Sequence, residues 1–159
     1  MNTFRFLFII FSSYFFINSC VSSTLNSSKI DYKFDELSFD VVKKNLNLDD
    51  DLPKGFIDPL NYWFNNKIKL KGFEGEMSIF IEDYSEEITN IPDGKKVEIY
   101  VNFKIFIRNT QNKTKNISGE VKSFSEISGD FSLNELDNLI EDTQYNLVLQ
   151  LANKLSKYN

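Results

Sequence analysis

The clearest pattern in this chain is an unbroken alternation of apolar and polar positions over residues 97–107. Its apolar members are Val97, Ile99, Val101, Phe103, Ile105 and Ile107. Such alternation predicts a β-strand with one face against a core and the other face largely in water. Weaker patterns of the same period predict further strands, which span 33–46, 74–90 and 116–128.

A first helix is predicted between residues 58 and 70. Asp58 is placed to cap the free backbone N–H groups, and Pro59 suits the first helical position, where its missing N–H costs nothing. Behind this start, apolar residues recur at helical spacing, namely Leu60, Trp63, Phe64 and Ile68. Gly72 marks the end of the run. A tryptophan can serve as a ligand platform, but Trp63 shares a face with this apolar set, so we expect it to anchor the helix in the core.

A second, longer helix is predicted from Ser132 to about Lys157, because Ser132 and Glu135 form a capping-box sequence ahead of a long apolar stripe. The elements then follow in the order β-α-β-β-β-α. The turn at 92–94 and the polar loop at 109–115 predict that the last three strands form an antiparallel meander. The first strand would join an edge of this sheet, either parallel or antiparallel to its neighbour. The predicted fold class is α+β, a two-layer sandwich in which two helices cover one face of a mostly antiparallel four-stranded sheet.

Four aromatic residues fall on the nominally outer face of the predicted strands, namely Phe80, Tyr100, Phe106 and Phe124. Aromatic side chains gathered on a wet face are unusual unless something covers them. These four residues are therefore a candidate binding face. The alternative is that lateral packing and the chain's own tail cover them, and the sequence leaves both readings open.

The N-terminal segment has the pattern of an export signal, with Arg5 ahead of an apolar run at 6–17. That run is shorter than the roughly 20 apolar residues that a membrane-spanning helix needs. The residues that follow, Ile17-Asn18-Ser19-Cys20, resemble the lipobox of bacterial lipoproteins. The resemblance implies a signal peptide at 1–19 and a lipidated Cys20 that holds the chain in a membrane. An ordinary secretory signal and an uncleaved membrane helix are the two alternatives.

The lipobox also implies how the rest of the chain is organised. Residues 20–32 would form the lipidated cysteine and a flexible Ser/Asn-rich tether, and residues 33–159 a single α+β domain. Val21, directly after the cysteine, resembles lipoproteins that are sorted to the outer membrane. We therefore expect the chain in the cell envelope, lipid-anchored and facing the periplasm, with the outer membrane favoured over the inner membrane.

The composition removes much catalytic chemistry. The chain has no histidine and one cysteine, which excludes Ser-His-Asp and Cys-His sites and imidazole metal sites. The net charge is −5 with no basic block, so nucleic acid is not an expected partner. The aspartates at 49–51 lack the spacing of a calcium-binding loop, and the acidic run at 82–87 is typical of a solvated strand edge. We expect no enzyme activity, no cofactor and no metal site, and no residue is selected as catalytic.

From residue 20 onward the chain resembles a group of uncharacterised alphaproteobacterial lipoproteins. The resemblance rests on apolar spacing in the strand near Phe39, the helix after Pro59 with its Trp63, the strands at 75–81 and 97–107, and the helix after Ser132. In outline the chain is also similar to the lipoprotein subunit of the outer-membrane lipopolysaccharide translocon. These resemblances imply a non-enzymatic accessory that binds an envelope protein or a glycolipid. A carrier of lipid or another apolar ligand is the alternative, and a carboxylate-based hydrolase is the least favoured function.

Overall fold

The computed structural model describes residues 33–158. The predicted signal peptide, the predicted lipidation site Cys20 and the predicted tether lie outside these residues. Residues Tyr32–Asn159 form one compact unit, and its core draws on side chains from Phe34 to Leu155. Because this unit contains its own core, we expect it to fold by itself.

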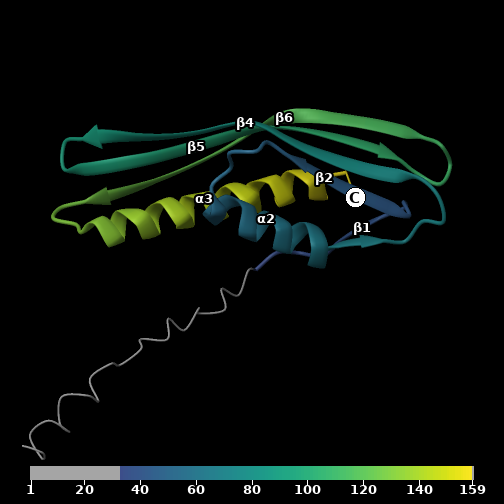
Figure 1. Cartoon of the computed structure of the whole chain (residues 1–159), viewed down its shortest axis with the longest axis horizontal. Helices are drawn as coiled ribbons and strands as arrows, with labels where there is room; N and C mark the ends of the chain where they lie inside the picture. Colours follow the sequence, from purple (N-terminus) through teal and green to yellow (C-terminus); the bar gives the residue numbers. More distant parts are fainter. Residues whose placement is uncertain (1–32, 159) are drawn as a thin grey trace, which may run out of the picture. The chain divides into compact units, whose positions relative to one another are not determined.

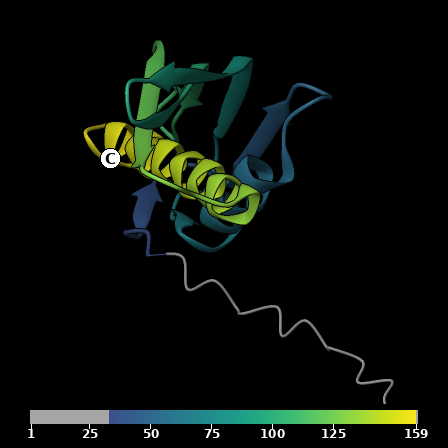
Figure 2. The same ribbon diagram turned by 90° about the vertical axis from the view of Figure 1, so that its left-hand side faces the viewer.

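Within residues 33–158, two helices pack on a four-stranded sheet (Figure 1). In chain order the elements are β1 (Leu37–Phe39), β2 (Lys43–Leu48), α2 (Lys54–Asn66), β3 (Ile68–Leu70), β4 (Glu76–Ile91), β5 (Gly94–Arg108), β6 (Thr114–Ser128) and α3 (Leu133–Ser156). The main sheet has the order β2-β4-β5-β6, in which β2 is parallel to β4 and the other neighbours are antiparallel. β1 and β3 form a separate parallel pair. Figure 1 shows both helices on one side of the main sheet, and Figure 2 shows the same layers after a quarter turn, so the predicted α+β sandwich is confirmed.

The inner face of the main sheet is packed with the apolar side chains that alternate along its strands. Those with no exposed surface on β4 and β5 are Met77, Ile79, Val97, Ile99 and Val101. Helix α2 adds Trp63, which is also 0% exposed. The prediction that Trp63 anchors its helix in the core is therefore confirmed. Its indole Nε1 has no hydrogen-bond partner among the described residues.

The predicted start of the first helix is wrong by about one turn. α2 begins at Lys54, and the carbonyl oxygen of Pro53 accepts the N–H of Phe56 at 3.0 Å. Asp58 is therefore not the N-cap, and Pro59 lies inside the helix rather than at its first position. An interior proline loses a backbone hydrogen bond. The extra turn persists because it places Phe56 in the core with no exposed surface, and this burial offsets the loss.

The predicted end of this helix at residue 70 is also wrong. α2 ends at Asn66, and Ile68 pairs instead with Leu37 in the small β1-β3 sheet. Ile68 is 1% exposed, so it is buried as its place in the apolar pattern predicts, but it is buried in a strand and not in a helix. Helical spacing of apolar residues alone does not separate these two outcomes.

A lysine from the sheet caps the C-terminus of α2. The ammonium of Lys44 on β2 donates hydrogen bonds to the carbonyl oxygen of Phe64 and, at 2.8 Å, to that of Ile68. It also lies 4.9 Å from the centroid of the Phe64 ring. Burial, followed by repulsion from Lys69, lowers the pKa of Lys44. A cation at this point satisfies carbonyl groups that have no partner within the helix.

The single strand predicted over 33–46 is two strands, β1 and β2. The chain bends between them, and Gly72 packs so closely there that a Cβ would lie 2.5 Å from the backbone nitrogen of Val41. β1 pairs with β3, whereas β2 pairs with β4 in the main sheet. The alternation runs through the bend because Val41 is buried like its neighbours Leu37 and Phe39. A period-2 pattern therefore shows which side is buried but not which strand is the partner.

The strand predicted over 74–90 is β4, which runs through the acidic residues and continues to Ile91. A bulge between Glu82 and Ser85 shifts its register with β5, and Asp83 adopts a φ of 52° there. β2 pairs with β4 only as far as Ile81. Beyond that point β4 has β5 on one side only, so the acidic run lies on a strand edge as predicted.

Helix α3 starts with the predicted capping box. The Ser132 hydroxyl accepts the N–H of Glu135 at 3.3 Å, and the Glu135 carboxylate accepts the N–H of Ser132 at 2.7 Å. The hydrogen bond from the Ser132 backbone, followed by that from its side chain, lowers the pKa of Glu135. Within the described residues, neither α3 nor α2 has the length and apolar character needed to cross a membrane.

Candidate functional site

The outer face of the main sheet carries the four predicted aromatic residues, and the structure brings them together as two pairs. The first pair is Phe80 on β4 and Phe106 on β5. Their rings meet edge to face with centroids 5.6 Å apart. Phe106 is 44% exposed and Phe80 is half-buried. The pair therefore leaves apolar surface exposed for a binding partner, and the edge-to-face contact stabilises the position of both rings.

The second pair is Tyr100 on β5 and Phe124 on β6. In the strand register Tyr100 lies opposite Lys122 and Phe124 opposite Glu98, so the two rings are diagonal neighbours on one face. Tyr100 is 36% exposed and Phe124 is 62% exposed. The ammonium of Lys96 lies 5.1 Å from the centroid of the Phe124 ring. This cation–π contact holds a charge beside the ring without covering it.

The two pairs do not merge into one patch. Tyr100 and Phe106 are separated by about 20 Å along β5, at roughly 3.4 Å per residue. The face between them carries polar groups, including Lys104, whose ammonium lies 2.8 Å from the Glu82 carboxylate. The candidate binding face expected from the sequence thus consists of one ring contact, Phe80 with Phe106, and two diagonal neighbours, Tyr100 and Phe124, with charged groups between them.

Three lysines of this face, Lys96, Lys104 and Lys122, are paired with its carboxylates. Glu98 binds the ammonium groups of Lys122 at 2.5 Å and Lys96 at 2.8 Å. The hydrogen bond from Lys122, followed by that from Lys96, lowers the pKa of Glu98. Nucleic acids and other polyanions need unpaired cations, and these three lysines are each held by a carboxylate. The outer face therefore combines exposed aromatic side chains with lysines that are paired with carboxylates.

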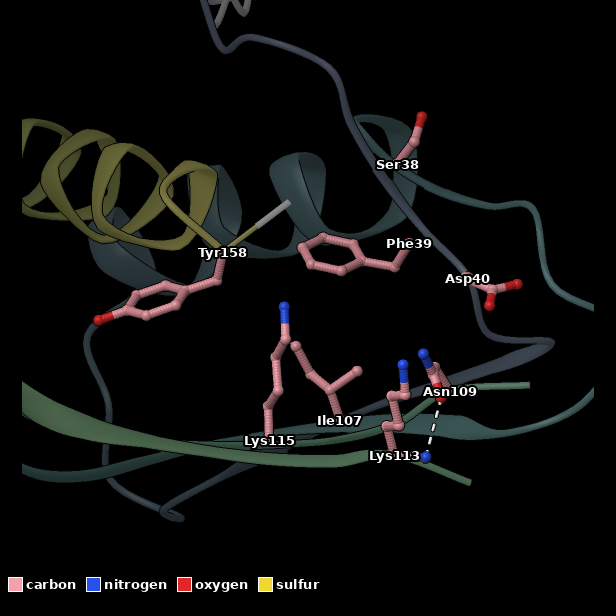
Figure 3. Close-up of a pocket in the computed structure, with 8 residues that line it drawn as sticks. All are labelled: Ser38, Phe39, Asp40, Ile107, Asn109, Lys113, Lys115 and Tyr158. Atoms are coloured by element: carbon pink, nitrogen blue, oxygen red, sulfur yellow. Dashed lines mark hydrogen bonds between the residues drawn. The ribbon is translucent and has the colours of Figure 1, made fainter. Parts of the chain in front are cut away.

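A cavity of about 250 Å³ lies on the inner side of the sheet, at the end where α3 stops (Figure 3). Its walls include Phe39 of β1 and Ile107 of β5, which are only 4% and 5% exposed. Tyr158, just after α3, lines it from the opposite side. Three segments that are distant in the sequence thus meet around one small apolar space.

Two lysines from the β5–β6 hairpin also line this cavity, namely Lys113 and Lys115 (Figure 3). Lys115 lies directly opposite Ile107 in the register, so it occupies a position on the core side of β6. Among residues 33–158 neither ammonium forms an ion pair. Among the described lining residues, the one carboxylate is that of Asp40, which accepts a hydrogen bond from the Thr110 hydroxyl at 2.8 Å. The cavity therefore combines apolar walls with two unpaired positive charges.

Sequence reasoning missed this cavity because it assigned Lys113 and Lys115 to a polar hairpin loop. β6 begins at Thr114, so Lys115 belongs to the strand. The sequence does contain a signal for this placement. Lys115 is an even number of residues from Ile117 and Val121, the apolar residues of that strand, so it lies on the same face. The contributions of Phe39 and Tyr158 could not be read from any local pattern.

A polar cluster joins α3 to β4 near the bulge. Gln144, which is 3% exposed, donates to the Tyr84 hydroxyl at 3.2 Å and to the Glu86 carboxylate at 3.0 Å. The Tyr84 hydroxyl donates to Glu86 at 2.9 Å. Burial, followed by the hydrogen bond to Glu86, raises the pKa of Tyr84. These groups therefore satisfy one another's hydrogen-bonding capacity. In the described part of the chain, no three acidic, histidine or cysteine side chains are close enough together to hold a metal ion.

No protein-family model matches the sequence, and the comparison with curated proteins gives no match. The comparison with solved structures does find similar ones. A minor lipoprotein from Acinetobacter baumannii is similar over 74% of this chain and 94% of its own, with 13% identity and a TM-score of 0.53. The rare lipoprotein B from Shewanella oneidensis is similar over 74% and 96%, with 10% identity and a TM-score of 0.48. These neighbours are bacterial lipoproteins, and at 13% identity the first likeness establishes a shared fold.

Proposed function

We propose that this chain is a non-enzymatic accessory of a bacterial cell envelope, anchored by a lipid on Cys20, that binds a partner through the outer face of its sheet. The observation that carries the proposal is the two aromatic pairs, Phe80 with Phe106 and Tyr100 with Phe124, which leave apolar surface exposed beside lysines that are held by carboxylates. Aromatic residues are enriched at the centres of protein interfaces, where they contribute much of the binding energy.

The charge balance of this face favours an envelope protein over an anionic glycolipid as the partner. Recognition of a phosphate or carboxylate headgroup requires cations that are not already neutralised. On the outer face Lys104, Lys96 and Lys122 are each held by a carboxylate. The sequence resemblance to alphaproteobacterial lipoproteins, and in outline to the lipoprotein subunit of the lipopolysaccharide translocon, agrees with an assembly role of this kind.

The binding role is tested by capture from detergent-solubilised envelopes of the source bacterium. We expect the wild-type protein to retain a specific envelope protein and the double variant Phe106→Ala/Phe124→Ala to lose at least nine-tenths of it. Phe73→Ala is the matched control, because Phe73 is 90% exposed but lies in the loop between β3 and β4, off the sheet face. Equal recovery by all three proteins would show that the outer face is not the binding surface.

The anchor is tested separately by labelling. Expressed in a bacterial host, the full chain should incorporate radiolabelled palmitate and fractionate with membranes, with the outer membrane favoured and the domain facing the periplasm. Cys20→Ser should abolish both the label and the membrane association, because several acyl chains are what make such attachment lasting. Label that persists in Cys20→Ser would rule out the lipobox.

A carrier of an apolar ligand is the second candidate function, and the inner cavity is the observation that favours it. In the centre of the core the side chains of Trp63 and Ile99 have no exposed surface. We expect a carried ligand to use the cavity near Tyr158, whose walls include the apolar Phe39 and Ile107. Native mass spectrometry of residues Tyr32–Asn159 purified from bacteria would detect it, and a uniformly ligand-free spectrum would contradict a carrier.

A further inference from the structure

The cavity at the end of α3 is lined in a way that neither a lipid anchor nor the outer face explains. Lys115 stands on the core side of β6 opposite Ile107, where the alternation of the sheet calls for an apolar residue. Burying a charged group is costly unless it is paired, and a lysine avoids this by laying its alkyl stem along apolar surface and keeping its ammonium free. In Figure 3 the side chain of Lys115 extends from the sheet toward the end of α3, between Ile107 and Tyr158.

The charges around this cavity are not balanced as those of the outer face are. Lys113 and Lys115 have no ion-pair partner within residues 33–158. The Asn109 side-chain oxygen accepts the N–H groups of Gln111 and Lys113 at 3.1 and 3.0 Å, so it is used by the turn itself. The Asp40 carboxylate accepts a hydrogen bond from the neutral Thr110 hydroxyl and keeps its charge, so the described lining carries two positive charges and one negative charge. Two ammonium groups beside an apolar space are suited to an anion that carries an apolar part.

The volume limits what such a ligand can be. A cavity of about 250 Å³ corresponds to about eight water molecules at roughly 30 Å³ each, and hence to a ligand portion of roughly eight non-hydrogen atoms. Pockets for drug-sized molecules are usually larger, at about 300–1,000 Å³. The space therefore suits a short alkyl chain with a small headgroup, or the head end of a longer chain.

We propose that this cavity binds a single-chain amphiphile with an anionic head. The carboxylate or phosphate head pairs with Lys113 and Lys115, and the alkyl chain lies against Phe39, Ile107 and Tyr158. The site is on the inner side of the sheet and does not depend on the outer face, so either proposal stands if the other fails. An inward-pointing lysine on an edge strand also discourages pairing with other strands, and that role alone would require no ligand.

The test is a titration of isotope-labelled Tyr32–Asn159, followed by amide NMR, with sodium octanoate and with octyl phosphate. We expect saturable shifts centred on Phe39, Ile107 and Lys115, with a dissociation constant of about a millimolar or below for a ligand of this size. Acetate and inorganic phosphate supply the head without the tail, and octanol supplies the tail without the head. Each of these three should bind at least tenfold more weakly than the full amphiphile.

The lysines are tested with a control in the same structural setting. Lys115→Met and Lys113→Met should each weaken octanoate binding about tenfold. Lys95→Met should leave it unchanged, because Lys95 also stands on the core side of the sheet, opposite Ile127, but at the far end of β5. Tyr158→Ala should weaken octanoate binding while leaving the response to acetate as it was. Amide spectra of each free variant show that it is folded.

Several results would overturn the proposal. Absence of saturable shifts, or an affinity that both lysine variants retain, would leave Lys115 with an edge-protecting role only. Acetate or inorganic phosphate binding as tightly as its octyl counterpart would show an anion site without an apolar part, and octanol binding as tightly as octanoate would show the reverse. A preference between octyl phosphate and octanoate supports the proposal in either direction, and it tells whether the natural head is a phosphate or a carboxylate.

Discussion

Adjacent residues on β5 show how differently the two faces of one sheet are used. Ile105 on the inner face is 1% exposed, whereas Phe106 on the outer face is 44% exposed. The inner face is held by apolar burial, which is the main favourable contribution to folding. The outer face carries paired charges and aromatic rings whose contribution to folding is small. Substitutions on the inner face should therefore change stability, and substitutions on the outer face should change binding.

The largest effect should come from removing an inner-face ring. Phe103→Ala empties a site that is 2% exposed, and we expect it to lower the free energy of unfolding by about 3–5 kcal/mol. Urea denaturation of residues Tyr32–Asn159 measures the loss. A cost below about 1 kcal/mol would mean that the inner face does not carry the stability, and the contrast between the faces would fail.

A smaller effect is expected from the lysine that caps α2. Lys44→Met keeps the length of the side chain but removes the hydrogen bonds to the carbonyl groups of Phe64 and Ile68, which should cost about 1–2 kcal/mol. Lys43→Met is the matched control, since Lys43 is exposed at the neighbouring outer-face position of β2. The same denaturation experiment should give the control a change within about 0.5 kcal/mol. Equal costs for both variants would contradict the capping role.

The polar cluster between α3 and β4 should make stability sensitive to alkaline pH. The pKa of Tyr84 is raised above its ordinary value near 10, so above that pH the unfolded chain loses this proton while the folded chain keeps it. The stability that Tyr84 contributes is therefore complete below about pH 10 and declines as the pH rises further. Tyr84→Phe should cost about 1 kcal/mol at pH 8 through its lost hydrogen bonds. It should also reduce the fall in stability between pH 8 and pH 11, and an unchanged slope in urea denaturation would contradict the assignment.

The smallest effect on stability is expected at the outer face. Phe124 is 62% exposed, so Phe124→Ala should change the free energy of unfolding by no more than about 0.5 kcal/mol. Compared with Phe103→Ala, this is the same chemical change on the opposite face of the sheet. A loss above about 2 kcal/mol would show that the exposed ring has a structural task, and its use in binding a partner would no longer be needed to explain it.

Much of the fold was available from local patterns. The hairpin from β4 to β5, the long alternation of β5 and the capping box of α3 all lie within a few residues of the features that determine them. By contrast, the start of α2 depends on the burial of Phe56, and the break between β1 and β2 depends on two different partner strands. These contacts join residues that are distant in the chain, and no local pattern records them.

The same division applies to the candidate sites. Alternation alone placed Phe80, Tyr100, Phe106 and Phe124 on the wet face, because side chains on a strand must point to opposite sides in turn. Their grouping into two pairs was decided by the strand register, which sets which residues are neighbours across the sheet. The cavity was decided by tertiary structure entirely, since β1, the β5–β6 hairpin and the end of α3 meet only in the folded protein. The sequence determined which side chains are buried and which are wet, and only the assembled layers decided which of them are neighbours, because long-range contacts follow from packing the whole chain at once.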